Sequence, residues 1–293
     1  MTNGLIPVSK FKNGFTTCGD LDEDDRITVL ALNDSTLGVH KINSGTTHKL
    51  VNPPKPSKSS PGLPPPKKAW EAIYPKGSIN PGGPTPGGFG FYLSGPDAFA
   101  KQLQAGAKEI IMSYRMMLEK DWEWVKGGKL PGWFGGEGDL AYRCSGGRQD
   151  QRCQCFDMRP MWRTSGLGEL YTYLPLTDQN EEVLKKIPPK FVGNPQYGFS
   201  VGRGAYKFQN ALGNWVSVAC RIKLNDVGKT NGEVELWIDG KSVIKGTGLL
   251  LRNSKTSIIK GMHFETFFGG NTKDWASPKE QRAWFADVTG VIL

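Results

Sequence analysis

The chain has 293 residues, 38 glycines, 20 prolines and a formal net charge of +9 at neutral pH. This composition favours one large all-β domain with many tight turns, and it is long enough to bury a sizeable core. The charge indicates a polyanionic partner. Because the basic residues are scattered, an acidic polysaccharide is at least as good an interpretation as nucleic acid, and no apolar stretch approaches the ~20 residues that span a membrane.

The N-terminal part differs in composition from the rest of the chain. Apolar residues gather around 6–15 and 27–39, so we expect residues 1–52 to add strands to the main sheets. Residues 53–68 contain seven prolines and predict an extended surface linker. From residue 69 to residue 293 the pattern is that of a globular domain.

Alternation of apolar and polar residues predicts most of the regular structure in that domain. Glycine and proline exclude it from residues 75–90. Strands are expected at 109–118, 155–163, 169–173, 216–224, 233–238 and 262–268, the last clear one, with a hairpin turn at Asp239-Gly240 and short helices at 96–104 and 278–284. The fold class is therefore all-β: two antiparallel sheets packed as a sandwich, whose polar strand faces line an open groove.

Several kinds of chemistry are excluded by the motifs. The glycine-rich stretches lack the ending of a P-loop and the setting of a dinucleotide fold, and no GxSxG elbow is present. Three histidines make a histidine-rich metal site or a Ser–His–Asp triad a poor interpretation, so no metal or cofactor is expected. Glu233 and Glu235 share a strand face beside a hairpin, which is typical of a solvated surface.

Cations and tyrosines instead share neighbouring strand faces. Asp157, Arg159 and Arg163 lie on one face of one strand, and Tyr171 and Tyr173 lie on one face of the next. Such a face is often only a set of cross-strand ion pairs. The same groups, however, suit β-elimination from a uronic acid, which needs a cation on the carboxylate, a base for the C5 proton and an acid for the departing O4.

Other residues complete this set of candidates. Lys129 is expected in a glycine-lined turn, residues 127–132, where its side chain projects freely. Nearby positive charge is expected to lower the pKa of the tyrosines. His263 and Glu265 alternate on one strand face and are expected to form a buried hydrogen-bonded pair. Trp122, Trp124 and Trp133 are mostly core residues in this interpretation.

The segments that carry these residues resemble a known family. They are 122–136, 156–163, 168–175, 199–208, 215–241 and 261–270. In order and spacing they resemble polysaccharide lyase family 14, and most closely its fungal members. The resemblance implies a jelly-roll β-sandwich with a groove on its concave sheet, which cleaves alginate or β-linked glucuronic acid chains by β-elimination without an obligatory metal.

The resemblance also implies roles for individual residues. The family's functional lysine falls on Lys129, its groove arginine on Arg159 and its tyrosine pair on Tyr171 and Tyr173. In our assignment Arg159 or Lys129 neutralises the substrate carboxylate, and one tyrosine serves as base and then acid. Lys129 becomes the base if the proton and O4 leave from opposite sides of the ring. Further substrate-binding candidates are Arg115, Asp157, Arg163, Arg203, His263 and Glu265.

Two further positions follow from the same resemblance. Family members often carry serine at the position of Asp157, whose carboxylate is expected to repel an anionic substrate or to pair with Arg159. Cysteines 144, 153 and 155 lie close together, and a disulfide that pins a loop is expected among them. The family's loop cysteines fall on Cys144 and Cys155, which leaves Cys153 free or as the alternative partner.

The sequence thus predicts a secreted, extracellular and monomeric polysaccharide lyase that acts on glucuronan or alginate. A signal peptide is not apparent at the start of the sequence. Two alternatives stay open at this point. One is a lectin-like module that binds acidic glycans, and the other is a sandwich-fold glycoside hydrolase, which needs two carboxyl groups roughly 5–10 Å apart across the groove.

Overall fold

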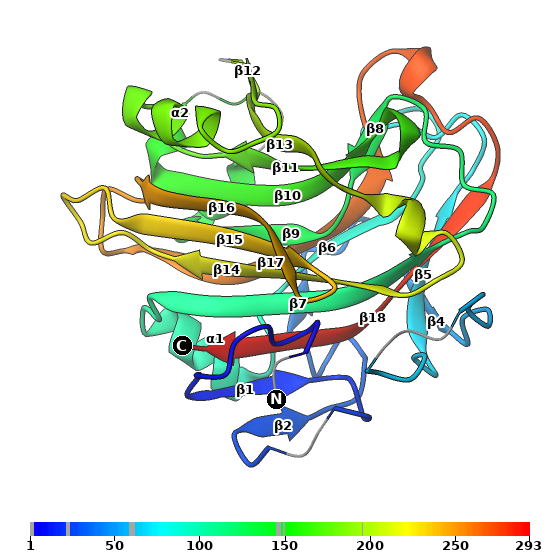
Figure 1. Ribbon diagram of the computed structural model, residues 1–293, viewed down its shortest axis with the longest axis horizontal. Helices are drawn as coiled ribbons and strands as arrows, with labels where there is room; N and C mark the ends of the chain where they lie inside the picture. The colour runs from blue at the N-terminus through cyan, green and yellow to red at the C-terminus, as the bar shows by residue number, and fades with distance from the viewer. Residues whose placement is uncertain (1–2, 22–23, 59–61, 145–147, 149, 195) are drawn as a thin grey trace.

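The computed structural model describes residues 3–21, 24–58, 62–144, 148, 150–194 and 196–293. Two large sheets pack face to face (Figure 1), as the sequence predicted for a β-sandwich. We name them the β7 sheet and the β10 sheet, after a central strand of each. None of the helices in the described part of the chain is long and apolar enough to cross a membrane.

The β7 sheet contains both the C-terminal strand and part of the N-terminal segment. Its order is β16 (Lys241–Leu249), β15 (Gly232–Ile238), β14 (Val216–Lys223), β7 (Glu109–Leu118), β18 (Gln281–Ile292), β1 (Asn13–Thr16) and β2 (Ile27–Val29), and β5 (Ala69–Tyr74) joins β18 to β4 (Lys49–Val51). Neighbours are antiparallel except β1 and β2, which are parallel.

The β10 sheet is antiparallel throughout the described residues. Its order is β12 (Val192–Asn194), β13 (Gly198–Lys207), β11 (Leu167–Tyr173), β10 (Cys155–Arg163), β8 (Gly127–Lys129), β17 (Ser257–Phe268), β6 (Phe89–Leu93) and β3 (Val39–His40). Strand β9 (Gly132–Glu137) also lies between β10 and β17, so β8 and β9 fill one position in the sheet.

Helices are few and short. They are α1 (Asp97–Gln104), α2 (Asp178–Lys185) and the 3-10 turns η1 (Gly138–Arg143), η2 (Arg152–Gln154), η3 (Thr164–Gly166), η4 (Phe208–Ala211) and η5 (Lys273–Trp275). Helix α1 confirms the prediction for residues 96–104, whereas α2 was not predicted. The predicted helix at 278–284 is wrong, because Gln281 begins the long strand β18.

Strand β18 also shows that the strand at 262–268 is not the last one. Its run Ala283-Trp284-Phe285-Ala286 shows no alternation because both of its faces are buried. A strand covered on both faces has no polar side, and its sequence then resembles that of a buried helix. Only the surrounding layers distinguish the two.

Alternation was informative where one face is open. On β10, Phe156, Met158 and Trp162 point into the core between the sheets, as predicted. They pack there with residues of both sheets, including Phe264 and Phe285. The alternate residues of β10 therefore point away from the core, on the outward face of the β10 sheet.

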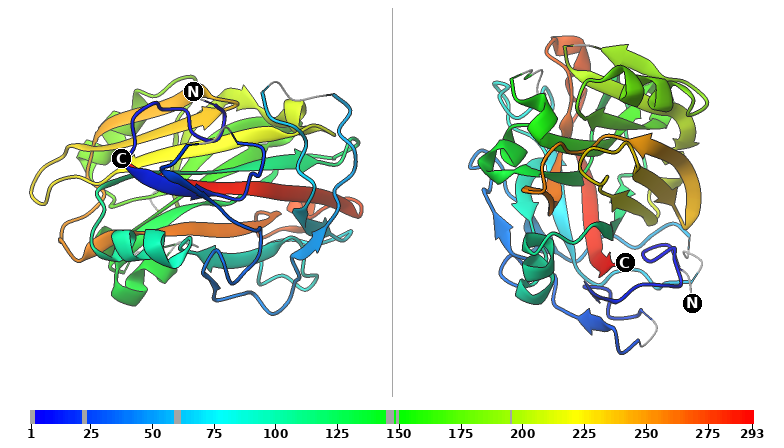
Figure 2. Two further views of the ribbon diagram at one scale, coloured as in Figure 1. Left: turned by 90° about the horizontal axis from the view of Figure 1, so that it is seen from below. Right: turned by 90° about the vertical axis from the view of Figure 1, so that its left-hand side faces the viewer.

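The outward face of the β7 sheet is covered instead. Leu5 and Ile6 of the N-terminal segment pack against Ile111 and Trp237 in a second apolar cluster. Seen from below (Figure 2, left), this dark blue segment crosses in front of β18 and β7. The N-terminal segment thus shields part of the outward face of the β7 sheet.

Candidate active site

A cleft of about 710 Å³ lies on the outward face of the β10 sheet. Its floor comes from β8, β10, β11 and β17, and its walls come from loops and from the N-terminal segment. The lining residues are Lys41, Asn43, Asn80, Pro81, Gly90, Phe91, Tyr92, Lys129, Arg159, Met161, Arg163, Tyr171, Tyr173, Asn194, Tyr197, His263, Glu265, Phe267, Gly269, Gly270, Asn271 and Trp275. All four residues predicted to be catalytic, and His263, Glu265 and Arg163 with them, line this one cleft.

Lys129 is buried at the centre of the cleft floor. It is 6% exposed, and its Nζ lies 3.5 Å from the centroid of the Tyr171 ring and 5.1 Å from that of Tyr173. Within the described chain the Nζ has no hydrogen-bond partner. Burial lowers the pKa of Lys129 well below its usual range, and the charges of Arg159 and Arg163 lower it further.

The expected turn around Lys129 is wrong, because this residue ends strand β8. The glycine beside it has a packing role. A Cβ on Gly128 would lie 2.1 Å from the Trp162 ring, so only glycine lets β8 pass over this core tryptophan. The glycine-rich sequence that suggested a turn thus reflects a close approach between strand and core.

Arg159 is held by an ion pair with Glu265. Its Nη1 donates to Glu265 Oε2 at 2.8 Å, and its Nη2 donates to the Glu265 backbone carbonyl. Arg159 lies on β10 and Glu265 on β17, with β9 between them. Gly132 of β9 makes this reach possible, because a Cβ there would lie 2.6 Å from the Arg159 Cγ.

His263 lies between two carboxylates. Its Nδ1 is 2.7 Å from Asp157 Oδ2, and its Nε2 is 3.3 Å from Glu265 Oε2. Burial and Arg159 act to lower the pKa of His263, but Asp157 and Glu265 outweigh them and raise it. Burial alone would raise the pKa of Glu265, yet Arg159 and His263 lower it to about 2.

The predicted pairing of His263 with Glu265 is therefore present, and Asp157 extends it. The expected pairing of Asp157 with Arg159 is wrong, because Asp157 pairs with His263. The physical reason is that Arg159 already points across Gly132 to Glu265, while His263 presents its second ring nitrogen to Asp157. Four buried groups then form one chain of contacts, Asp157–His263–Glu265–Arg159.

The two tyrosines lie together above Lys129. Their ring centroids are 5.2 Å apart with an edge-on arrangement. Burial raises the pKa of Tyr171, the neighbouring Tyr173 raises it further, and Arg163 opposes this only in part. The expectation that positive charge lowers the tyrosine pKa is thus wrong for Tyr171, because loss of solvent outweighs the arginine.

Arg163 and Arg203 share one buried carboxylate. Glu169 accepts from Arg163 Nη2 at 2.6 Å, from Arg203 Nε at 2.6 Å and from the Ser200 hydroxyl. Burial opposes ionisation of Glu169, but its partners, Arg163 first, hold its pKa below the usual range. Arg163 lines the cleft, whereas Arg203, predicted as a substrate contact, stands behind Glu169 and outside the cleft lining.

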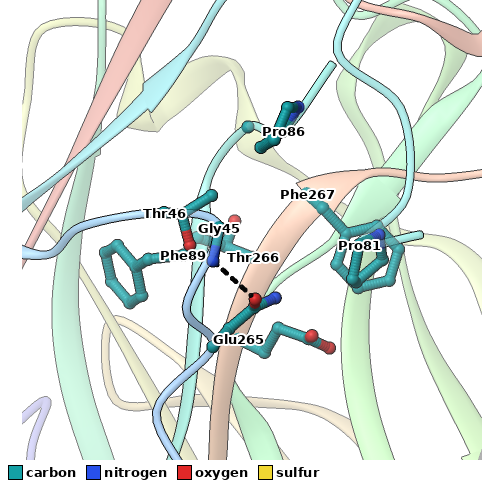
Figure 3. A pocket seen from close by; sticks show the side chains of 10 residues that line it. Gly45, Thr46, Pro81, Pro86, Phe89, Glu265, Thr266 and Phe267 are labelled. Atoms are coloured by element: carbon teal, nitrogen blue, oxygen red, sulfur yellow. Dashed lines mark hydrogen bonds between the residues drawn. The ribbon is translucent and has the colours of Figure 1, made fainter. Parts of the chain in front are cut away.

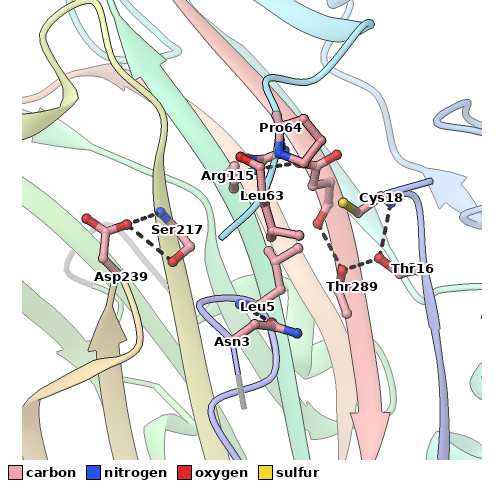
Figure 4. Close-up of polar contacts among 11 residues, drawn as sticks. Asn3, Leu5, Thr16, Cys18, Leu63, Pro64, Arg115, Ser217, Asp239 and Thr289 are labelled. Atoms are coloured by element: carbon pink, nitrogen blue, oxygen red, sulfur yellow. Dashed lines mark hydrogen bonds and ion pairs between the residues drawn. The ribbon is translucent and has the colours of Figure 1, made fainter. Parts of the chain in front are cut away.

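Arg115 does not belong to this cleft, although it was predicted to bind substrate. It lies on β7, in the other sheet, where it forms a buried ion pair with Asp287. Its guanidinium also donates to the backbone carbonyls of Leu63 and Pro64 (Figure 4). Arg115 falls in the strand predicted at 109–118, but alternation along a strand does not reveal which sheet face the chain later covers.

A disulfide joins Cys144 and Cys155, as the resemblance implied, with their Cα atoms 5.7 Å apart. Cys153 is exposed and free, so it is not the alternative partner. The disulfide packs against Tyr173, and the partly buried Tyr171 packs against the same cluster. It therefore ties the loop before β10 to the tyrosine side of the cleft.

Sequence reasoning missed the walls of the cleft. Trp275 ends the 3-10 turn η5, Tyr197 lies in the turn before β13, and Lys41 and Asn43 come from the N-terminal segment. Figure 3 shows Gly45 and Thr46 of that segment close to Glu265 and Phe267. No periodic pattern marks such residues, since loop side chains follow no fixed alternation.

Comparisons with known proteins agree with this architecture. A family model described as polysaccharide lyase 14 matches residues 64–288. The crystal structure of the marine PL-14 alginate lyase from Aplysia kurodai superimposes with a TM-score of 0.70 at 28% identity, covering 97% of this chain and 100% of that chain. No curated protein sequence matches the chain.

More distant structures share the fold. Alginate lyase vAL-1 from Chlorella virus has a TM-score of 0.64 at 22% identity, covering 88% of this chain and 93% of its own. A variant of alginate lyase Aly36B, solved with an alginate tetrasaccharide, has a TM-score of 0.55 at 19% identity, covering 77% of this chain and 81% of that chain.

Proposed function

The chain belongs to polysaccharide lyase family 14 and is a lyase of uronic acid polysaccharides, and we propose that it cleaves a β-1,4-linked polymer, alginate or glucuronan, by β-elimination. Alginate is favoured because the structural relative with 28% identity is described as an alginate lyase. In the reaction a base takes the C5 proton and the electron pair forms the C4–C5 double bond. The C4–O4 bond breaks, and an acid protonates O4.

The observation that carries this proposal is the environment of Lys129. A base must be unprotonated before it can accept the C5 proton, and a lysine in water is protonated at neutral pH. The lowered pKa of Lys129 favours the neutral amine, and in the described chain its Nζ has no hydrogen-bond partner that would compete for the lone pair. This supports Lys129 as the base, rather than a tyrosine.

The tyrosines suit the complementary role. A raised pKa keeps the Tyr171 hydroxyl protonated, so that it can give its proton to O4 as the bond breaks. Environments that push two pKa values apart in this way are typical of an acid and a base that act together. Tyr171 and Tyr173 are adjacent, and we assign the acid to this pair.

Positive charge near the substrate carboxylate is needed to make the C5 proton acidic. Arg159 and Arg163 both line the cleft, but Arg159 is already paired with its own carboxylate, Glu265. Arg163 shares the single carboxylate of Glu169 with Arg203. That set keeps an excess positive charge, which favours Arg163 as the group that neutralises the carboxylate, with Arg159 beside it.

The same contacts argue against hydrolysis. A glycoside hydrolase needs two carboxyl groups on opposite sides of the bond that it cuts. Among the described residues that line the cleft, Glu265 is the one carboxylate, and Asp157, which is bound to His263, is not among them, so no second carboxyl group faces Glu265 across the cleft. We also propose that the protein acts outside the cell, because a disulfide persists best in an oxidising compartment.

The test is the formation of an unsaturated uronate, which absorbs near 235 nm. Polymannuronate, polyguluronate and glucuronan are compared, with a neutral glucan as control. We expect absorbance to rise with a uronate polymer only, and Lys129→Met to reduce kcat by ~10²–10⁴-fold. New reducing ends without absorbance at 235 nm would establish hydrolysis instead. Because Met replaces an amine without a partner, unfolding should occur at an unchanged or higher temperature.

A further inference from the structure

The wall of the cleft formed by residues 39–46 lies outside the region that matches the family model, 64–288. Strand β3 pairs His40 with Tyr92 of β6, and the Asn43 amide donates to the Gly90 carbonyl at 2.8 Å. The Asn43 side chain in turn accepts from the Gly45 amide, which holds the turn closed. This segment is therefore built onto the sheet that carries the active site.

Lys41 is placed in this wall by an unfavourable backbone conformation. Its φ angle is 50°, in the left-handed region where residues with a Cβ are uncommon. Such conformations persist where the surrounding structure enforces them, and they gather at ligand-binding positions. Here the pairing of β3 before Lys41 and the Asn43 hydrogen bond after it impose the turn.

The ammonium group of Lys41 is exposed and has no carboxylate within ion-pair distance among the described residues. It lies 4.6 Å above the centroid of the Tyr142 ring, and Tyr142 is hydrogen-bonded to His40. Lys41 also lines the cleft. The positive charge of Lys41 therefore lies over the Tyr142 ring at the edge of the cleft, where an anionic ligand can pair with it.

Lys41 follows directly after β3, which lies three strand positions across the sheet from the strand of Lys129. In the strand order β8, β17, β6, β3, three spacings of about 4.8 Å put β3 roughly 14 Å from β8. We propose that Lys41 and the 39–46 segment form a remote subsite, which binds the carboxylate of a uronate ring other than the one that is cleaved. This inference rests on the proposed function and adds a binding position to it.

The subsite predicts a dependence on chain length. A long uronate chain fills both the reacting position and the subsite, whereas the shortest oligomer that is cleaved leaves the subsite empty. Lys41→Gln should therefore lower the ratio of kcat/KM on polymer to kcat/KM on that oligomer by about two- to fivefold, through KM, as expected for one exposed ion pair. Lys10→Gln is the matched control, since Lys10 is equally exposed but lies in the segment that covers the other sheet.

The outcomes separate cleanly. A ratio that is the same in Lys41→Gln and Lys10→Gln overturns the subsite, and so does an equal loss on long and short substrates, which would place Lys41 at the reaction centre. If the wild-type protein forms no unsaturated product from any uronate chain, the proposed function fails. The subsite is then judged by calorimetric binding of uronate oligomers of increasing length to the wild-type protein and to Lys41→Gln, and equal binding overturns it.

Discussion

Two buried arginine–carboxylate pairs on the two sheets look alike in isolation. Arg159 and Glu265, in the β10 sheet, have side chains that are 2% and 14% exposed, and Arg115 and Asp287, in the β7 sheet, are 4% and 6% exposed. The first pair lies on the floor of the cleft. The second lies beside Leu63 and Pro64, whose carbonyls accept hydrogen bonds from Nη1 and Nη2 of Arg115.

The difference between the pairs is set by what covers each sheet. The N-terminal residues pack on part of the outward face of the β7 sheet, and the carbonyls of Leu63 and Pro64 bind Arg115 there, so that this pair ties the covering segment to the sheet. The outward face of the β10 sheet stays open, and its charged residues can meet a ligand. Burial of a charge by itself thus does not identify a functional residue.

The pKa values of the two carboxylates, Glu265 and Asp287, are also shifted in opposite directions. The cations Arg159 and His263 outweigh burial and lower the pKa of Glu265 to about 2. At Asp287 burial outweighs Arg115, and the pKa is raised. One carboxylate in the cleft has two cationic neighbours, whereas the covered one has a single arginine, and the balance changes sign.

The largest effect that this comparison predicts is a loss of kcat, caused by substitutions in the cleft on the β10 sheet. Tyr171→Phe or Tyr173→Phe keeps the ring that packs over Lys129 and removes only the hydroxyl. If that hydroxyl protonates O4, we expect kcat to fall by ~10²–10⁴-fold for at least one of the two, with KM and thermal stability little changed. Near-normal kcat in both variants would contradict the acid assignment. The measurement is the initial rate at 235 nm together with a melting curve.

On the covered face the expected effect is on stability alone. Arg115→Met leaves the Asp287 carboxylate buried without its cation, which typically costs about 3–5 kcal/mol of the free energy of unfolding. The folded fraction should keep wild-type kcat, because the cleft lies on the other sheet. Arg159→Met is the matched variant, and it should lose both stability and activity. Urea unfolding and rates per folded molecule separate the two; a fall in kcat for Arg115→Met would show that the sheets are coupled.

The smallest effect is a difference in pH dependence. Glu265 has a lowered pKa, so its contribution to stability is present above about 4.5 and is lost as the pH falls from there toward 2. Asp287 has a raised pKa, so its ionised form destabilises the folded state, and this destabilisation decreases as the pH falls and the carboxyl group is protonated. The stability deficit of Glu265→Gln relative to wild type should therefore shrink toward low pH.

For Asp287→Asn the deficit should instead shrink toward neutral pH. Urea unfolding of the three proteins between pH 3 and 7 measures both trends. Parallel curves for the two variants would show that the two carboxylates lie in equivalent surroundings, which would remove the contrast between the sheets.

Much of the floor of the cleft was predictable, because a strand with one buried face shows a regular alternation of apolar and polar residues in its sequence. Side chains two residues apart share a face, so that alternation alone groups Arg159 with Arg163 on β10, and Tyr171 with Tyr173 on β11. Lys129 was selected from the glycine-rich sequence around it, and the resemblance of these segments to polysaccharide lyase family 14 pointed to the same lysine and added the pairing of Cys144 with Cys155.

Only the tertiary structure decided what lies above each face and between the strands. The tertiary structure places Arg115 on the other sheet from Arg159. It pairs Asp157 with His263 instead of Arg159. It also places Lys41, which lies outside the region matched by the family model, in the lining of the cleft. It also showed β18 as a central strand. Alternation fixes the direction of a side chain relative to its own strand, but it carries no information about which distant segment packs over that strand, and this packing sets burial, charge pairing and pKa.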